Sequence, residues 1–137
     1  NDMAKLGQLH TQKAGTLEGD AQKEELKNAD VAYEDLQNRY ENAIEYATFM
    51  RARVNSYQDP DQKLGLALPF YQKLEEMIAP KETKDKADNA RLIEAYRYMI
   101  SYYYVAKDDK AKATEFAHKL LKIDPENDIA KQVLGVK

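Results

Sequence analysis

The chain has 137 residues, of which 43% are hydrophobic and 33% charged, and this balance is typical of a folded, well solvated protein rather than a disordered one. Its formal net charge of −3 at pH 7 argues against a general affinity for nucleic acid. It contains no cysteine, which excludes disulfides and thiol chemistry and leaves a periplasmic and a cytoplasmic location equally open.

No stretch of about 18 consecutive apolar residues occurs, so we expect no direct insertion into a membrane. No signal peptide is visible either. The sequence opens abruptly at Asn1-Asp2 with helix-like residues, which leads us to expect a fragment or a processed form of a longer protein. Its length predicts a single domain over residues 1–137.

Strand signals are almost absent, and helical periodicity recurs between short polar breaks. We therefore predict an all-α fold. The expected helices cover residues 2–14, 20–38, 42–57, 60–78, 86–107, 109–122 and 125–135.

Two Asp-Pro pairs look like helix starts. Asp59 is the candidate N-cap of the fourth helix, with Pro60 in its first position, where the missing N–H does no harm. Gly65 and Pro69 should then bend the first half of that helix. By the same logic Asp124 and Pro125 should begin the last helix.

Half of the ten tyrosines fall within nine positions, in the segment YRYMISYYYVAKDD at 96–109. On a helical wheel Tyr96, Tyr103 and Tyr104 share one side, which we expect to be core with hydroxyl groups at polar rims. Tyr98 and Tyr102 lie largely on another side. For these two, a core role and a role in partner binding both stay open.

The surrounding sequence, AYRYMISYYYVAKDDKAKATEFAHKLLKIDPEN, resembles a tetratricopeptide repeat (TPR), a helix-turn-helix unit of about 34 residues. In the first helix of this repeat pattern, a large apolar residue is followed by a small residue and, three positions further on, by a tyrosine. Ile100, Ser101 and Tyr104 match these positions. The turn falls at 108–109. In the second helix and beyond, Ala113 and Pro125 match the pattern, and Phe116 and Leu120 continue the buried stripe. Arg97, Ala117 and Leu120 depart from the pattern, which prefers tryptophan, an aromatic residue and alanine at these positions.

Weaker copies of the second-helix signature occur at Ala67, Phe70, Tyr71 and Leu74, and at Ala29, Tyr33 and Leu36. The resemblance implies a right-handed α-solenoid of about three TPR-like hairpins, as in a bacterial TPR-domain protein or a fragment of one. The approximate repeats are 2–38, 42–79 and 86–123. The terminal helix at 125–135 would either cap the stack or begin a further repeat.

Catalytic and metal-binding signals are missing. His10 and His118 are expected on separate helices without a zinc-binding motif around either. The adjacent glutamates at 24–25 and 75–76 point in different directions on a helix and do not form a paired-carboxylate site. No phosphate-binding loop or nucleophile motif appears. We therefore expect neither an enzyme, nor a metal site, nor a cofactor.

TPR resemblance instead implies a protein or peptide partner, bound in a groove lined by the first helices of the repeats. By register, the residues expected there are Gln8, Thr11, Phe49, Arg53, Ser56, Tyr98, Tyr102 and Val105. Among these we single out as partner-binding Gln8, Phe49, Arg53, Tyr98 and Tyr102, because aromatic and arginine side chains dominate binding energy at many interfaces. Arg51 is a candidate for a structural role.

Two alternatives to this scaffold or adaptor function stay open. An open end of the stack would allow self-association, for instance as a homodimer. The chain would otherwise be an accessory module of a larger protein whose activity lies elsewhere. A small-molecule pocket between helices is a further option, although no converging polar residues indicate one.

Overall fold

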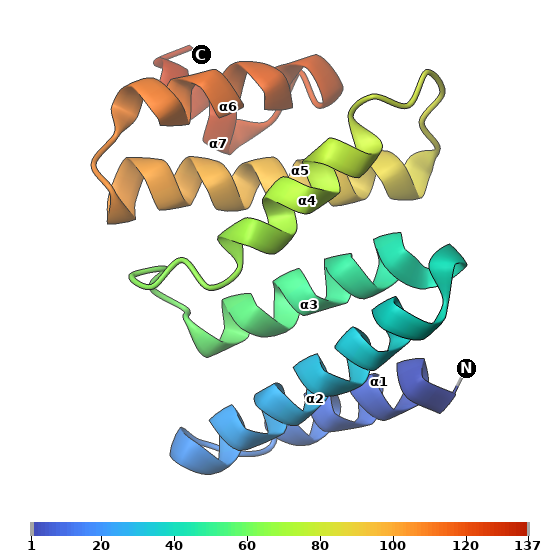
Figure 1. Ribbon diagram of the computed structural model, residues 1–137. Coiled ribbons are helices and arrows are strands. Elements are labelled where there is room, and N and C mark those ends of the chain that lie inside the picture. Colours follow the sequence, from blue (N-terminus) through green and yellow to red (C-terminus); the bar gives the residue numbers. More distant parts are fainter. Residues whose placement is uncertain (1, 137) are drawn as a thin grey trace. The chain divides into compact units, whose positions relative to one another are not determined.

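A computed structural model describes residues 2–136, and within them the chain is helical, without a strand (Figure 1). This confirms the predicted all-α class. The α-helices are α1 (Asp2–Ala14), α2 (Gly19–Arg39), α3 (Ile44–Gln58), α4 (Leu68–Ile78), α5 (Lys86–Ser101), α6 (Lys110–Ile123) and α7 (Asp128–Leu134), with a 3-10 turn at Glu41–Ala43 and a π-helical segment at Tyr102–Ala106. No helix in this part of the chain combines the length and the apolar character needed to cross a bilayer.

Two compact units divide the chain. The first unit contains the residues up to Pro60 together with Leu64–Phe70, and the second contains Asp61–Lys63 and the residues from Tyr71 onward. The boundary therefore runs through the first turn of α4. Each unit is described separately below.

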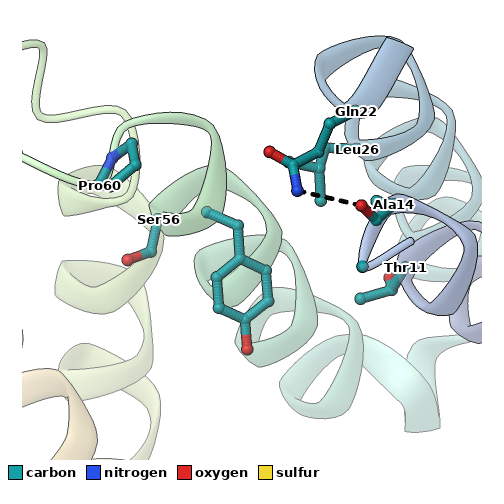
Figure 2. A pocket seen from close by; sticks show the side chains of 8 residues that line it. Thr11, Ala14, Gln22, Leu26, Ser56 and Pro60 are labelled. Carbon is teal, nitrogen blue, oxygen red and sulfur yellow. Dashed lines mark hydrogen bonds between the residues drawn. The ribbon is translucent and has the colours of Figure 1, made fainter. Parts of the chain in front are cut away.

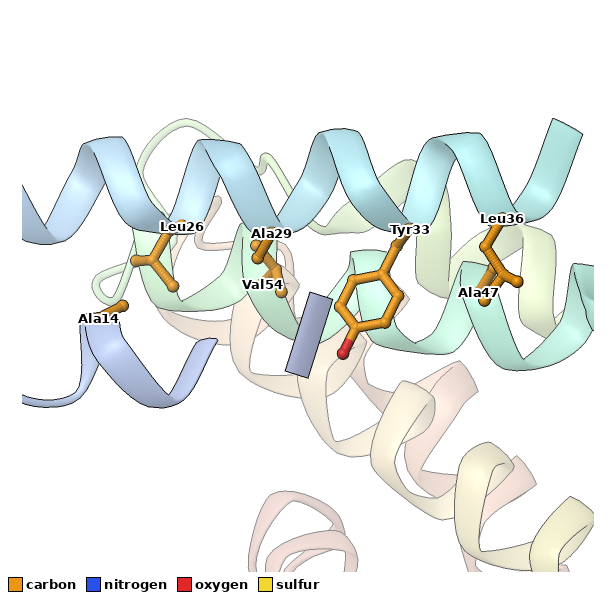
Figure 3. Packing of buried hydrophobic residues seen from close by; sticks show 7 residues of the cluster. All are labelled: Ala14, Leu26, Ala29, Tyr33, Leu36, Ala47 and Val54. Carbon is orange, nitrogen blue, oxygen red and sulfur yellow. The ribbon is translucent and has the colours of Figure 1, made fainter. Parts of the chain in front are cut away.

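In the first unit, α2 packs against both α1 and α3. The positions predicted from the repeat signature, Ala29, Tyr33 and Leu36, are buried in its core, as expected. Figure 3 shows these side chains pointing from α2 toward the neighbouring helices. The full cluster consists of Ala14, Leu26, Ala29, Tyr33, Leu36, Ala47 and Val54.

The fourth helix begins later than predicted, and Asp59 is not its N-cap. Residues between α3 and α4 form a loop, in which the carboxylate of Asp59 is buried and accepts the N–H groups of Leu64 and Leu66, each at 3.2 Å. This carboxylate satisfies backbone donors that a loop leaves unpaired. Pro69 is the second residue of α4, where its missing N–H is harmless, so it produces no bend inside a helix.

In the second unit, α5 and α6 form a helical hairpin. A capping box begins α5 at the predicted position: Asp85 accepts the N–H of Asp88 at 2.7 Å, and Asp88 accepts the N–H of Asp85 at 3.1 Å. Between the two helices Ala113 of α6 is fully buried, as the small position of the repeat requires. Other buried residues of this unit include Leu74, Ile78, Leu92, Ala95, Met99, Ile100, Phe116, Ala117, Leu120 and Ala130.

The tyrosine segment leaves the α-helical pattern. The N–H of Lys107 donates to the carbonyl of Tyr102 at 3.0 Å, five residues back, which defines a π-helical turn. A helical wheel that assumes 100° per residue therefore misplaces the side chains in this wider turn. Tyr104 is consequently 40% exposed, although it was predicted as core, whereas Tyr103 stacks on Phe116 with ring centroids 5.7 Å apart. Tyr96 is buried, as predicted, and lies 6.1 Å from the same ring.

The last helix also begins later than the Asp-Pro signal predicted. Asn127 caps α7 by accepting the N–H of Ala130 at 3.1 Å. Asp124 instead follows the end of α6, and its carboxylate accepts the side-chain N–H of Asn127 at 3.1 Å. The Asp-Pro pair thus organises the turn before the helix rather than the helix itself.

Candidate functional site

A hydrogen bond in the first unit joins a predicted site residue of α1 to α3. Gln8 of α1 donates its side-chain N–H to the hydroxyl oxygen of Tyr46 on α3 at 3.2 Å. These two helices are separated in sequence by the whole of α2, so this contact ties the first helix of one hairpin to the first helix of the next. We call the surface formed by Gln8, Thr11, Tyr46, Phe49, Arg53 and Ser56 the α1–α3 face.

Phe49 and Arg53 form a stacked pair on this face. They are one helical turn apart on α3, and the guanidinium carbon of Arg53 lies 4.3 Å from the centre of the Phe49 ring. Both side chains are half-buried. At this distance the cation is attracted to the π-electrons of the ring, which holds the long arginine side chain in one orientation.

Arg51, two residues before Arg53, points away from this pair. Its Nε and Nη2 atoms lie 2.9 and 3.2 Å from the two carboxylate oxygens of Asp30, and further hydrogen bonds reach Glu34 and Gln37 of α2. The same guanidinium lies 4.6 Å from the centre of the Phe70 ring. This network fixes α3 against α2, as the structural role considered for Arg51 requires.

A pocket of about 540 Å³ opens at one end of the α1–α3 face (Figure 2). It lies where the turn after α1, the start of α2 and the end of α3 meet. The side-chain amide of Gln22 donates to the carbonyl of Ala14 at 3.0 Å on its wall. The lining residues are Thr11, Ala14, Gly15, Gln22, Leu26, Ser56, Tyr57 and Pro60.

Only Thr11 and Ser56 of these lining residues were expected in the groove. Pro60 was missed because it was assigned to a helix, and Gln22 because it belongs to a second helix rather than a first one. No sequence signal marks this combination, since the pocket arises from helix ends and a loop that lie close together only in the folded unit.

The second unit holds the other two predicted site residues, Tyr98 and Tyr102. They are 7% and 8% exposed, so both side chains are buried, as the core role considered for them requires. Their rings stack at 6.2 Å with an interplanar angle of 10°, and Tyr98 also lies 4.8 Å from Tyr71 of α4. The hydroxyl group of Tyr71 donates to Glu94 of α5 at 2.9 Å, which adds to the packing of α4 on α5. A role of these tyrosines in partner binding stays a prediction.

A smaller pocket of about 320 Å³ lies between the end of α5, the π-helical segment and α7. Val105, another residue expected in the groove, lines it and is largely exposed. Its other lining residues are Arg97, Ile100, Ser101, Tyr104, Ile129, Gln132 and Val133.

Three of the titratable residues that drew attention in the sequence, His10, Glu25 and Glu75, form hydrogen bonds between helices. Nδ1 of His10 lies 2.6 Å from a carboxylate oxygen of Glu25, and the hydrogen bond with His10 is the main cause that lowers the pKa of Glu25. Glu75 of α4 accepts a hydrogen bond from Lys119 of α6 at 3.1 Å. Within residues 2–136 no group of three or more histidine and carboxylate side chains is arranged to hold a metal ion. These contacts join helices, and none of them assembles an acid–base pair in a pocket.

Comparison with known structures defines the class of fold. The chain is similar to the crystal structure of the C-terminal part of a TPR repeat-containing protein from Cytophaga hutchinsonii, with 33% sequence identity and a TM-score of 0.78. The match covers 96% of this chain and 45% of the other, so this chain spans less than half the length of that structure. No protein-family model and no curated protein sequence matches it. The fold is therefore that of a TPR-like helical-repeat protein, as the repeat signature predicted.

TPR-like folds serve in general as scaffolds for protein–protein interaction, and they are typically non-catalytic. Stacked helical hairpins present extended surfaces on which a partner can lie. Which surface of this chain would be used is a separate question, and the α1–α3 face is the best-defined candidate.

Proposed function

We propose that this chain is a non-catalytic scaffold that binds a short segment or a helix of a partner protein on the α1–α3 face. Phe49 and Arg53 would make the principal contacts, with Gln8 at the edge on α1. The supporting observation is the Phe49–Arg53 pair, in which the cation lies 4.3 Å from the ring centre on a half-buried surface. Aromatic and arginine side chains in such positions often contribute most of the binding energy of an interface.

The Phe49–Arg53 pair is already ordered before a partner binds, which supports its role in binding. An arginine that must be ordered on binding loses side-chain entropy, at a cost of roughly 0.5–1.5 kcal/mol. The ring of Phe49 already restricts Arg53, and the Gln8–Tyr46 hydrogen bond holds α1 beside α3. A partner would therefore meet a surface whose side chains are largely in place, which favours binding.

In this proposal Tyr98 and Tyr102 take the core role, one of the two that the sequence left open. Being buried, they would support the shape of α5 and α4 in the second unit rather than anchor a partner directly. Replacing both with alanine would then lower the stability of that unit. The partner-binding variant is accordingly built from residues of the first unit alone.

Affinity capture tests the proposal with the full chain as bait. The binding variant is Phe49→Ala/Arg53→Ala. Its matched control is Arg39→Ala/Tyr40→Ala, which removes an arginine and an aromatic ring from exposed positions at the end of α2. We expect a partner to be retained by the wild type and the control and lost by the binding variant at unchanged helicity. A partner retained equally by all three would place binding elsewhere, and the α1–α3 face would be the wrong site.

A further inference from the structure

The large pocket of the first unit has a lining without a single ionisable carboxylate, ammonium or guanidinium group. All eight lining residues are uncharged at neutral pH, in a chain of which one third is charged. Ala14, Leu26 and Pro60 contribute apolar surface, while Thr11, Gln22 and Ser56 contribute polar atoms. Such a mixture is typical of ligand pockets, which are mainly apolar with a few oriented polar groups and enclose about 300–1,000 Å³. A charged ligand group would lose hydration there without gaining an ion pair.

Two of the polar side chains are oriented by hydrogen bonds to the backbone. The Gln22 amide donates one of its two N–H groups to the carbonyl of Ala14 at 3.0 Å, which orients the group and turns its oxygen away from Ala14 (Figure 2). The hydroxyl group of Thr11 donates to the carbonyl of Gly7 at 2.8 Å, so its oxygen too is left to accept. Both groups therefore offer an oxygen acceptor to a ligand that brings a hydrogen-bond donor.

An uncharged apolar body carrying one donor describes the side chains of tryptophan and tyrosine. When such rings are buried, the indole N–H or phenol O–H needs a hydrogen-bond acceptor. These rings therefore fit an apolar pocket that also offers an acceptor. We propose that this pocket receives a tryptophan or tyrosine side chain of the bound partner segment, with its N–H or O–H donated to Gln22 or Thr11.

The pocket is continuous with the α1–α3 face, and the inference rests on the function proposed for that face. Thr11 lies one turn beyond Gln8 on α1, and Ser56 lies one turn beyond Arg53 on α3. A segment lying across the Phe49–Arg53 pair toward this end of the helices would bring a neighbouring side chain to the pocket. The face would then provide general affinity and the pocket would select the aromatic residue.

Two probes of nearly equal apolar surface test the chemistry of the pocket. Indole carries the N–H donor, whereas 1-methylindole replaces it with a methyl group. The full chain, labelled with ¹⁵N, is titrated with each probe while backbone amide shifts are followed by NMR. We expect shifts at Thr11, Gly15 and Ser56 and roughly tenfold tighter binding of indole, since a buried acceptor left without its donor is unfavourable.

Variants of the two acceptors identify the group responsible. Gln22→Met and Thr11→Val each remove one acceptor with little change in volume, and the preference for indole should fall in at least one of them. Gln12→Met is the matched control, because Gln12 is an exposed glutamine of α1 outside the pocket lining. Its preference for indole should equal that of the wild type.

Equal affinities for the two probes in the wild type, or shifts confined to other parts of the chain, would overturn the inference. A preference unchanged in both acceptor variants would overturn it as well. These outcomes are independent of the affinity capture described above. Loss of a partner in Phe49→Ala/Arg53→Ala together with equal probe affinities would leave the proposed function in place and remove only the pocket assignment. A clear preference for indole without any captured partner would remove the proposed function instead.

Discussion

Tyr33 of α2 lies directly against the backbone of Gly7 in α1, and no other residue type fits at position 7 without movement. A Cβ atom added at Gly7 would lie 2.5 Å from Cζ of Tyr33 and 2.7 and 2.8 Å from its two Cε atoms. Carbon atoms that are not bonded prefer a separation of roughly 3.5–4.0 Å. The absence of a side chain at Gly7 is therefore what allows the first two helices to approach each other around this ring.

Replacing Gly7 with alanine should destabilise the first unit. The clash with Tyr33 should cost about 1–3 kcal/mol, the usual range for overpacking. The better helix propensity of alanine offsets about 1 kcal/mol of this cost, so we expect a net loss of up to about 2 kcal/mol in the free energy of unfolding, measured with urea. In a Tyr33→Leu background, where the ring is gone, Gly7→Ala should be neutral or stabilising. A similar loss in both backgrounds would show that the ring is not the cause.

Replacing Tyr33 with phenylalanine should reduce the sensitivity of the protein to alkaline pH. Burial raises the pKa of Tyr33 to about 12 from an ordinary value of 10.0. The neutral form is thus favoured in the folded state, so the stabilisation is complete below pH 10 and is lost as the pH rises through 12. At pH 11 this residue should account for about 1 kcal/mol of lost stability.

The measurement is the free energy of unfolding at pH 8 and pH 11 for wild type and Tyr33→Phe. The hydroxyl oxygen of Tyr33 is buried without a hydrogen-bond partner among the described residues, so the variant should be at least as stable as the wild type at pH 8. Tyr104→Phe is the matched control, because it removes the hydroxyl group of an exposed tyrosine. An identical loss in wild type and Tyr33→Phe would contradict the prediction.

Replacing Asp59 with asparagine should weaken the loop before α4. Each carboxylate oxygen of Asp59 accepts one backbone N–H, from Leu64 and Leu66, and the side chain is only 4% exposed. An asparagine keeps one acceptor and turns an NH₂ group toward the other donor, at a cost of about 1–2 kcal/mol. Thermal and urea unfolding would measure this loss, whereas Asp61→Asn, at an exposed position of the same loop, should change little. Equal effects of the two substitutions would mean that burial of Asp59 is unimportant.

Replacing Arg51 with lysine should loosen the contact between α2 and α3. The guanidinium group makes a bidentate pair with Asp30 and lies over the ring of Phe70, and an ammonium group cannot reproduce this geometry. We expect a loss of about 1–2 kcal/mol in the free energy of unfolding. Arg39→Lys, at an exposed position of α2, is the control and should have almost no effect. A variant as stable as the wild type would make the network dispensable.

Helical periodicity was sufficient to predict most of this fold. The first helix was predicted with its observed bounds. The buried repeat positions Ala29, Tyr33 and Leu36 were also identified, because the apolar residues of an amphipathic helix recur with helical spacing along the sequence. The errors lie at helix ends. Asp59 was read as an N-cap, although its carboxylate binds the donors of a loop, and both roles require the same residue type.

The π-helical turn was not predicted from the sequence. Tyr104 was placed in the core by a rotation of 100° per residue, and one wider turn at Tyr102 is enough to move it toward solvent. For the candidate site, register identified Gln8, Phe49 and Arg53 on one face. The pocket beside them could not be predicted, because Gln22 and Pro60 come to line one pocket only through tertiary packing.

Mapping a bound peptide on the full chain by NMR tests the central claim most directly. A peptide is first selected for binding from a random library, and the amide shifts that it causes in the ¹⁵N-labelled protein are then recorded. Our account predicts that the largest shifts fall on Gln8, Phe49, Arg53 and their neighbours on the α1–α3 face, and that Phe49→Ala/Arg53→Ala abolishes them. Peptides that shift only residues outside this face, with affinity unchanged in that variant, would contradict it.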